Sequence, residues 1–246
     1  MQKGGKIMVS VLTDKGNRRS LNEDYFSYIE EEDYSIYVVA DGMGGHNAGE
    51  VASKMAAEGV VEYIKANITK INDKDILTKS IEKVNDDIYE YSMQDQKYSG
   101  MGTTITAALV TKQKIIIANV GDSSSFGVKE DKLIKLTKDH SLVQELVDLG
   151  TITEEQAAKH PKKNIITRAV GINSKVNVDI FYIEKNEYDM FLLCSDGLTN
   201  EVPKEDIIDI LCLKCDLDEK SKQLVELAKK NGGRDNITVL LFGGEK

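Results

Sequence analysis

The amino-acid sequence predicts an α+β protein in which helices are grouped outside β-sheets. Three observations favour this class. Short apolar runs rich in β-branched residues are typical of buried strands, and longer stretches repeat their apolar residues at helical spacing. The two kinds of segment do not alternate regularly, as they would in a doubly wound fold. Because no repeat or linker-like segment divides the chain, we expect one domain over residues 1–246.

Five runs have the length and composition of buried strands. Each contains several consecutive apolar residues and is bounded by polar residues or glycine. Their sequences are SIYVVA (35–40), TTITAALV (103–110), KIIIANV (114–120), MFLLC (190–194) and NITVLLF (236–242).

Five other stretches are expected to be helical. Apolar residues recur at helical spacing in the longer ones, Gly150 is a natural helix stop, and Pro203 suits a first helical position. Acidic residues follow Pro203, where they complement the positive end of a helix dipole. The predicted helices are 49–67, 76–92, 141–150, 203–213 and 217–233.

Composition and charge exclude several classes of protein. Hydrophobic residues make up 41% and charged residues 30%, as in an ordinary soluble globular protein. A net charge of −9 disfavours nucleic-acid binding, and no apolar run is long enough to cross a membrane. The N-terminus lacks the apolar core of a signal peptide, and three cysteines are too few for a disulfide scaffold. We therefore expect a cytoplasmic protein.

Four aspartates stand at the ends of predicted strands beside glycine. The run VVADGMGG (38–45) ends on Asp41, and the next two strands of this kind end on Asp122 and Asp196. Asp235 stands at the entry of the last strand. Although these residues are far apart in sequence, such strand ends can converge at one edge of a sheet core.

Converging carboxylates repel one another unless a cation lies among them. Mg²⁺ and Mn²⁺ take oxygen ligands from aspartate, backbone carbonyls and water, and a pair of such ions suits phosphate-ester hydrolysis. A single Asp-Gly after a strand is more commonly a turn, so the spacing alone leaves a turn and a metal site both open. Other phosphate-binding patterns are missing, including G-x-G-x-x-G, the Walker loop and Cys-x₅-Arg.

Seven segments taken together resemble the metal-dependent serine/threonine protein phosphatases of type 2C, in particular their compact bacterial members. The resemblance covers nearly the whole chain. It rests on the order of GNRRSLNED (16–24), VVADGMGGHNAGEVAS (38–53), GMGTTITAALV (100–110), ANVGDSS (118–124), LTKDHS (136–141), LLCSDGLTN (192–200) and GGRDNITVLLF (232–242).

The resemblance implies a four-layer α-β-β-α sandwich with a site for Mn²⁺ or Mg²⁺ at one end. Its two antiparallel sheets would be flanked by pairs of helices. Asp41 would bridge two core ions, and the Gly42 carbonyl would bind one of them. Asp196 and Asp235 would hold the other ion. Asp122 matches an aspartate that helps to hold a third, weaker ion in bacterial relatives.

The same resemblance assigns two catalytic candidates and a mobile segment, and His46, which follows the glycine-rich turn, is a third candidate. Arg19 matches an arginine that grips the substrate phosphate, which suits its bidentate fork. Asp24 matches an acidic residue that orients metal-bound water. His46 could donate a proton to the leaving group, although a surface turn is the alternative. Residues 141–170 match a flap beside the active site that is thought to shape substrate choice.

The implied activity is hydrolysis of phosphoserine and phosphothreonine in proteins by direct attack of a metal-bound water or hydroxide on phosphorus. The expected partners are phosphorylated proteins, including a bacterial Ser/Thr kinase whose action the enzyme would oppose. We expect a monomer with no nucleic-acid or membrane partner. Two alternatives remain: a phosphatase dedicated to one small regulator, and a relative that binds phosphoproteins without hydrolysing them.

A few further residues differ from the family pattern or have no counterpart in the matched motifs. Ser124 stands where relatives commonly carry arginine, which puts the affinity for a third ion in doubt. His140 is expected to be a structural hydrogen-bonding residue at the root of the flap. Cys212 and Cys215 form a lone C-x-x-C without a second pair, so we interpret them as ordinary core or surface residues.

Overall fold

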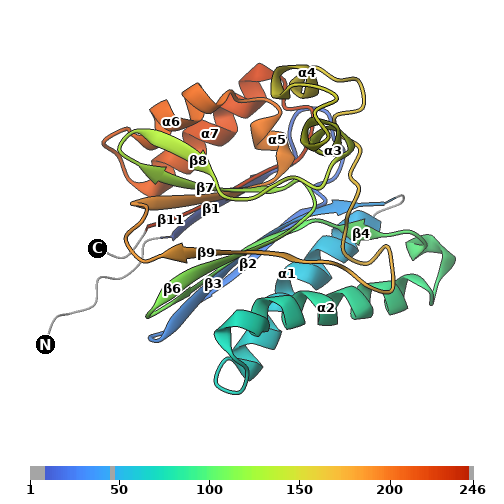
Figure 1. Cartoon of the computed structure of the whole chain (residues 1–246). Helices are drawn as coiled ribbons and strands as arrows, with labels where there is room; N and C mark the ends of the chain where they lie inside the picture. The colour runs from blue at the N-terminus through green and yellow to red at the C-terminus, as the bar shows by residue number, and fades with distance from the viewer. Residues whose placement is uncertain (1–8, 45–47, 244–246) are drawn as a thin grey trace, which may run out of the picture.

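The computed structural model describes residues 9–44 and 48–243. Two antiparallel sheets lie face to face, and helices cover the outer face of each sheet (Figure 1). This arrangement confirms the four-layer sandwich expected from the sequence. β4 and the helices α3 and α4 lie at the same end of the sandwich (Figure 1).

Within the described residues, one sheet has five strands in the order β1-β11-β10-β7-β8. All of its neighbouring strands are antiparallel. The strands are β1 (Val9–Asp14), β7 (Ser124–Lys129), β8 (Lys132–Lys135), β10 (Met190–Cys194) and β11 (Ile237–Gly243).

The other sheet follows the order β2-β3-β5-β6-β9, and a short strand β4 pairs with the end of β3. Its pairs are also antiparallel. The strands are β2 (Asp24–Glu30), β3 (Tyr34–Met43), β4 (Gly102–Thr103), β5 (Ile105–Thr111), β6 (Lys114–Val120) and β9 (Asp179–Glu184).

The helices form two outer layers and part of the flap. α1 (Ala48–Asn67) and α2 (Asp73–Ser92) cover the β3 sheet, followed by a 3₁₀ turn at Gln96–Tyr98. α5 (Asp196–Thr199), α6 (Lys204–Leu211) and α7 (Leu217–Asn231) lie over the β10 sheet, and α3 (Leu142–Asp148) and α4 (Glu154–Ala158) belong to the flap. No helix in the described ranges is long and apolar enough to cross a membrane.

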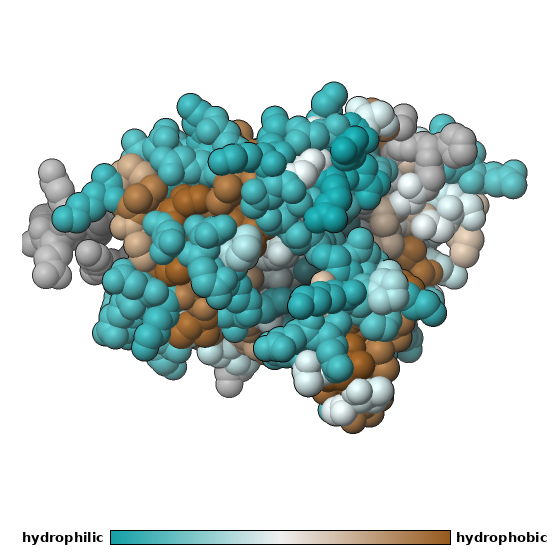
Figure 2. All heavy atoms as spheres, turned by 90° about the horizontal axis from the view of Figure 1, so that it is seen from above, coloured by the Kyte–Doolittle hydropathy of each residue, from teal (hydrophilic) through white to brown (hydrophobic). Residues whose placement is uncertain are grey.

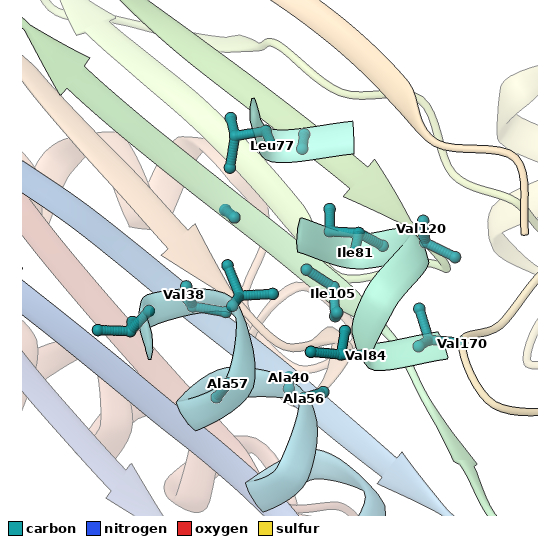
Figure 3. Close-up of a cluster of buried hydrophobic side chains, with 14 of the residues drawn as sticks. Val38, Ala40, Ala56, Ala57, Leu77, Ile81, Val84, Ile105, Val120 and Val170 are labelled. Atoms are coloured by element: carbon teal, nitrogen blue, oxygen red, sulfur yellow. The ribbon is translucent and has the colours of Figure 1, made fainter. Parts of the chain in front are cut away.

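Strands that are buried on both faces explain the continuous apolar runs of the sequence. Successive side chains of a strand point to opposite faces. In β3, Tyr37 and Val39 belong to the cluster between the sheets, whereas Ile36, Val38 and Ala40 face α1 and α2. Figure 3 shows part of this second cluster, in which Val38 and Ala40 lie near Ala56 and Ala57 of α1, and Leu77, Ile81 and Val84 of α2 complete the layer.

An aromatic stack lies at the centre of the layer between the two sheets. The rings of Tyr37 and Phe242 are 4.3 Å apart, and those of Phe242 and Phe191 are 5.0 Å apart, with nearly parallel planes. Tyr37 comes from the β3 sheet and both phenylalanines come from the β10 sheet. The stack therefore joins the two sheets by direct contact.

Five strands lie outside the runs that the sequence predicts. Four of them, β1, β2, β8 and β9, are the outermost strands in the order of their sheets. An edge strand has a neighbouring strand on one edge only, so its side chains are covered less completely. It therefore tolerates polar residues and needs no continuous apolar run. The fifth, β7, begins with two buried serines, Ser124 and Ser125. Serine is not typical of buried strands, so the sequence pattern did not predict this one. The predicted runs and helices agree with the structure apart from a few residues at their ends.

Backbone pairing closes the base of the flap and joins its C-terminal end to β4. Ser141 and Ile166 form an isolated β-bridge near its base, and Val170 pairs with Thr103 of β4. The backbone N–H of Thr167 also donates to the carbonyl of His140 at 2.8 Å. The single helix predicted over 141–150 corresponds to α3, while α4 was not predicted.

Candidate active site

The four strand-end aspartates converge on one cavity, whose wall also includes Asn164 and Ile166 of the flap. Asp41 belongs to β3, Asp122 follows β6, Asp196 follows β10, and Asp235 precedes β11. All four line one cavity of about 240 Å³, together with residues that include Arg19. The convergence predicted from the sequence is therefore present.

Asp41 is held by its backbone near the end of β3. Its N–H donates to the Thr104 hydroxyl at 3.0 Å, and its carbonyl accepts from the Thr104 N–H at 2.9 Å. Its neighbour Gly42 has no room for a side chain, because a Cβ there would lie 2.1 Å from the Gly49 carbonyl oxygen. Glycine at this position lets the start of α1 approach β3 closely, next to the cavity.

Asp24 lies opposite Asp41 in the pairing of β2 with β3. Its side chain is almost completely buried, and its Oδ2 accepts hydrogen bonds from the hydroxyls of Ser195 and Thr238, both at 2.7 Å. Its Oδ1 has no hydrogen-bond partner. Asp24 therefore lies behind the cavity wall, with one carboxylate oxygen fixed by two hydroxyls and the other free.

Asp196 and Asp235 have different local supports. Asp196 is the first residue of α5, and its Oδ2 accepts from the Asn200 amide at 2.8 Å, whereas its buried Oδ1 has no partner. Asp235 Oδ2 accepts from Arg19 Nη2 at 2.7 Å. The predicted phosphate-binding arginine thus reaches the same cavity as the predicted metal ligands.

Asp122 follows a tight turn at Gly121, whose φ of 107° favours glycine. The Gly121 N–H donates to Nδ1 of His140 at 2.9 Å, and the His140 N–H donates back to the Gly121 carbonyl at 2.9 Å. His140 is therefore a buried hydrogen-bonding residue at the flap root, as the sequence suggested. Asp122 is buried too, and its Oδ1 lacks a partner.

Burial and repulsion from neighbouring carboxylates act on Asp24, Asp41, Asp122 and Asp196. Burial raises the pKa of Asp24 to about 7, that of Asp122 to about 8 and that of Asp196 to about 6. Burial also raises the pKa of Asp41 well above its ordinary value, and the charges of Asp24 and Asp196 add to this effect. The cluster therefore favours protons, or another cation, among its oxygens.

The donor set fits hard divalent cations. Buried oxygens of Asp24, Asp122 and Asp196 have no hydrogen-bond partner, which is unusual for buried polar atoms and indicates a missing positive partner. Within the described residues, no group of three or more acidic, histidine or cysteine side chains is arranged so that it could hold a metal ion as it stands. One oxygen of the candidate ligand Asp235 is in contact with the guanidinium of Arg19.

Several residues of the site were not singled out from the sequence. Thr104 links the Asp41 backbone to the Asp122 turn, since its hydroxyl also contacts the Ser123 hydroxyl at 2.7 Å. Asn236 accepts from the Glu23 N–H at 2.8 Å and donates to the carbonyl of Leu21 at 2.8 Å. Asn236 directly follows the strand-end Asp235, which was the available signal, whereas Thr104 has no such neighbour in the sequence. His46 lies outside the described residues.

Comparison with known proteins gives consistent matches along the chain. The family model of protein phosphatase 2C matches residues 15–239. The chain is 45% identical over 233 residues to the serine/threonine phosphatase stp of Listeria welshimeri, covering 93% of this chain and 92% of that relative. It is 38% identical over 236 residues to the protein phosphatase PhpP of Streptococcus pneumoniae, covering 95% and 96% of the two chains.

Two solved structures are similar over almost their full lengths. The serine/threonine phosphatase Stp1 of Staphylococcus aureus has a TM-score of 0.92 and 36% identity, covering 100% of this chain and 98% of that one. The serine/threonine phosphatase PstP/Ppp of Mycobacterium tuberculosis has a TM-score of 0.88 and 33% identity, covering 98% and 99%.

Proposed function

Because the chain belongs to the protein phosphatase 2C family and is a serine/threonine protein phosphatase, we propose a metal-dependent mechanism for it at the cavity described above. Asp41 and the Gly42 carbonyl would hold two Mn²⁺ or Mg²⁺ ions together with Asp196 and Asp235. The observation that carries this proposal is the cluster of buried carboxylate oxygens without partners beside the cavity. When bound, such ions lower the pKa of water and offset the charge of phosphoryl oxygens.

The chain's own residues supply binding and proton positioning. Arg19 is half-exposed at the cavity, so its guanidinium can exchange Asp235 for two oxygens of a substrate phosphate. Asp24 keeps Oδ2 fixed on Ser195 and Thr238, which leaves Oδ1 to orient the attacking water. We assign the protonation of the departing serine or threonine oxygen to His46. This reaction is a direct displacement without a phosphoenzyme.

Asp122 is proposed as the carboxylate of a third, weaker cation site. It shares the cavity with Asp41 and Asp196, and its own free oxygen is buried. A site with one or two protein carboxylates and otherwise water binds Mg²⁺ or Mn²⁺ weakly. The third ion should therefore saturate only at metal concentrations well above those that fill the two core sites.

The proposed substrates are phosphorylated proteins, including a Ser/Thr kinase that the enzyme opposes. The relatives compared above are named phosphatases of this kind, which supports the substrate class. We further propose that the chain acts as a monomer built as one domain over 1–246, with the flap as its variable part. Its three free cysteines suit the reducing environment of a cytoplasm.

Metal dependence is the direct test of this mechanism. Purified protein should hydrolyse p-nitrophenyl phosphate and a phosphothreonine peptide with Mn²⁺, and it should lose both activities in EDTA. Restoring excess Mn²⁺ should restore the rate. Full activity after the metal is shown to be gone would overturn the mechanism, while binding of the phosphopeptide without turnover would favour a non-catalytic relative.

A further inference from the structure

A second cavity adjoins the proposed catalytic one. It measures about 650 Å³ and lies between the flap helices, the end of β8 and the segment from α5 to the start of α6. The two cavities share Asp122, Asn164 and Asp196 in their walls. A chain whose phosphate lies at the carboxylate cluster can therefore continue directly into this larger space.

The wall of this second cavity is rich in lysine, although the protein as a whole is acidic. Its net charge is −9. Side chains that bear positive charge nevertheless enter the cavity wall from β8, the segment after it, the flap and α6: Lys135, Lys138, Lys163 and Lys204.

Two of these lysines are already neutralised by carboxylates. Lys135 contacts both oxygens of Asp139, at 2.6 and 2.7 Å. Lys138 lies 2.6 Å from Asp148 of α3. Because each of these lysines is paired with a carboxylate, the two contribute little net charge to a ligand.

The other two lysines form no direct ion pair among the described residues, although the charge of Lys163 acts on Asp196 nearby. Lys163 donates to the neutral amide oxygen of Asn200 at 2.7 Å, which bridges the flap to the end of α5. Lys204 is exposed and, within the described residues, forms no ion pair or side-chain hydrogen bond. The remaining carboxylates of the wall are the metal candidates Asp122 and Asp196, together with Glu154.

We propose that this cavity receives the peptide segment next to the phosphorylated residue and that Lys163 and Lys204 select acidic side chains there. The inference rests on the proposed function, because the phosphate must lie at the adjoining carboxylate cluster. The size of the cavity suits a few residues of extended chain. The wall carries four lysines and four carboxylates, so its positive charge is local. With cations bound at Asp122 and Asp196, the charges of Lys163 and Lys204 would outweigh that of Glu154 and would attract acidic side chains and repel basic ones.

The outer surface is consistent with a polar, ion-pairing contact. Figure 2 shows the molecule from above, the side of α6 and α7, where hydrophilic residues cover most of the face and separate hydrophobic patches lie among them. An apolar docking groove would require a contiguous hydrophobic wall. The second cavity instead combines lysines with polar side chains such as Thr199 and Asn200.

The test compares three phosphothreonine peptides of equal length whose flanking residues are glutamate, glutamine or lysine. An exposed ion pair contributes up to about fivefold in affinity, so two lysines should give the glutamate peptide roughly a tenfold higher kcat/KM than the glutamine peptide. The lysine peptide should be the poorest substrate. Because the pairs are partly exposed, the preference should shrink at high salt.

Lys204→Glu and its matched control, Lys222→Glu, identify the source of the preference. Lys222 is an exposed lysine of α7 that does not line the cavity, so both variants change the net charge equally. Lys204→Glu should abolish or reverse the preference for the glutamate peptide, while Lys222→Glu should retain it. Equal kcat/KM for the three peptides in the wild type, or equal behaviour of the two variants, would overturn the inference.

Hydrolysis of p-nitrophenyl phosphate separates this inference from the proposed function. That substrate has no flanking residues to enter the second cavity. If the wild-type protein hydrolyses it with Mn²⁺ but shows no preference among the peptides, only the inference about Lys163 and Lys204 fails. If the wild type does not hydrolyse it under any metal condition, the proposed mechanism itself fails.

Discussion

Arg19 donates from Nη2 to Oδ2 of Asp235 across a distance of 2.7 Å, and the two residues are 216 positions apart in the sequence. The proposed roles of these residues differ, since Arg19 should bind phosphate and Asp235 should bind a cation. In their direct contact, each compensates the charge of the other. Binding of the cation and the phosphate should therefore release Arg19 from Asp235, so the two groups exchange partners within one cavity.

The first prediction concerns Arg19. Arg19→Ala should raise KM for phosphate esters by about tenfold and lower kcat less, because a phosphate grip acts in the ground state and the transition state alike. Arg18→Ala is the matched control, since Arg18 is also exposed but does not line the cavity. Steady-state kinetics of both variants are the measurement. If Arg19→Ala lowers kcat alone and leaves KM unchanged, Arg19 acts mainly in the transition state and the role proposed for it is wrong.

The second prediction concerns Asp41. As the proposed bridging ligand, it should be the costliest carboxylate to lose, so Asp41→Ala should reduce turnover by at least about a thousandfold. The variant should still fold, because it removes one member of a mutually repelling buried cluster. Circular dichroism would check the fold and Mn²⁺-dependent hydrolysis the activity. A near wild-type rate would show that the assignment of ligands is misplaced.

The third prediction concerns Asp122. Asp122→Ala should keep two tightly bound ions and lose much of its turnover, with a larger loss on phosphopeptides than on p-nitrophenyl phosphate. The physical reason is that Asp122 lines both the catalytic cavity and the second cavity beneath the flap. Calorimetry gives the number of bound ions. Loss of a core ion would place Asp122 among the core ligands, and unchanged turnover would reduce it to a turn residue.

The fourth prediction separates the two sides of the His140 ring. Nδ1 accepts from Gly121, next to Asp122, whereas Nε2 lies 3.1 Å from Asp179 and 2.9 Å from Arg168. Asparagine can place an acceptor near the Nδ1 position, and glutamine can reach the Nε2 position. If His140 acts by holding the Asp122 turn, His140→Asn should keep most of the activity and His140→Gln should lose about ten- to a hundredfold.

Exchange of the Gly121 amide proton provides a readout for His140 that does not depend on activity. Protection of this amide should persist in His140→Asn and fall in His140→Gln. The opposite order would mean that His140 serves mainly to anchor Arg168 and Asp179 near the start of β9. Equal loss in both variants would indicate that the whole ring is needed for packing.

The fifth prediction concerns stability without metal. Burial raises the pKa of Asp24 to about 7, so the folded protein retains a proton that the unfolded chain releases near pH 4. The folded state therefore binds more protons between about pH 4 and 7, and its stability falls as pH rises through this window. Asp24→Asn should remove this fall and raise the melting temperature in EDTA at pH 8, by roughly 2–4 °C for each kcal/mol gained.

Catalysis should change in the opposite direction in the same variant. Asp24→Asn keeps the side-chain shape but loses the negative charge that orients the attacking water, so kcat with Mn²⁺ should fall while stability in EDTA rises. Thermal melts across pH and kinetics at saturating Mn²⁺ are the two measurements. A variant that is less stable than the wild type in EDTA at pH 8 would contradict the assigned cost of burying Asp24.

The sequence by itself determined the fold class, the doubly buried strands and the positions of the strand-end aspartates. These features are local, because a strand covered on both faces must be apolar throughout, and a carboxylate at its end interrupts that run. The order of seven segments then indicated the family, which the comparisons confirm.

The tertiary structure decided which groups meet. The edge strands β1, β2, β8 and β9 carry little apolar signal of their own and are specified by their pairing partners. The free oxygens of Asp24, Asp122 and Asp196, the contact of Arg19 with Asp235, and the lysine-lined second cavity join elements that are distant in sequence. Burial, charge pairing and shared cavity walls are properties of several elements packed together, so local sequence patterns do not determine them.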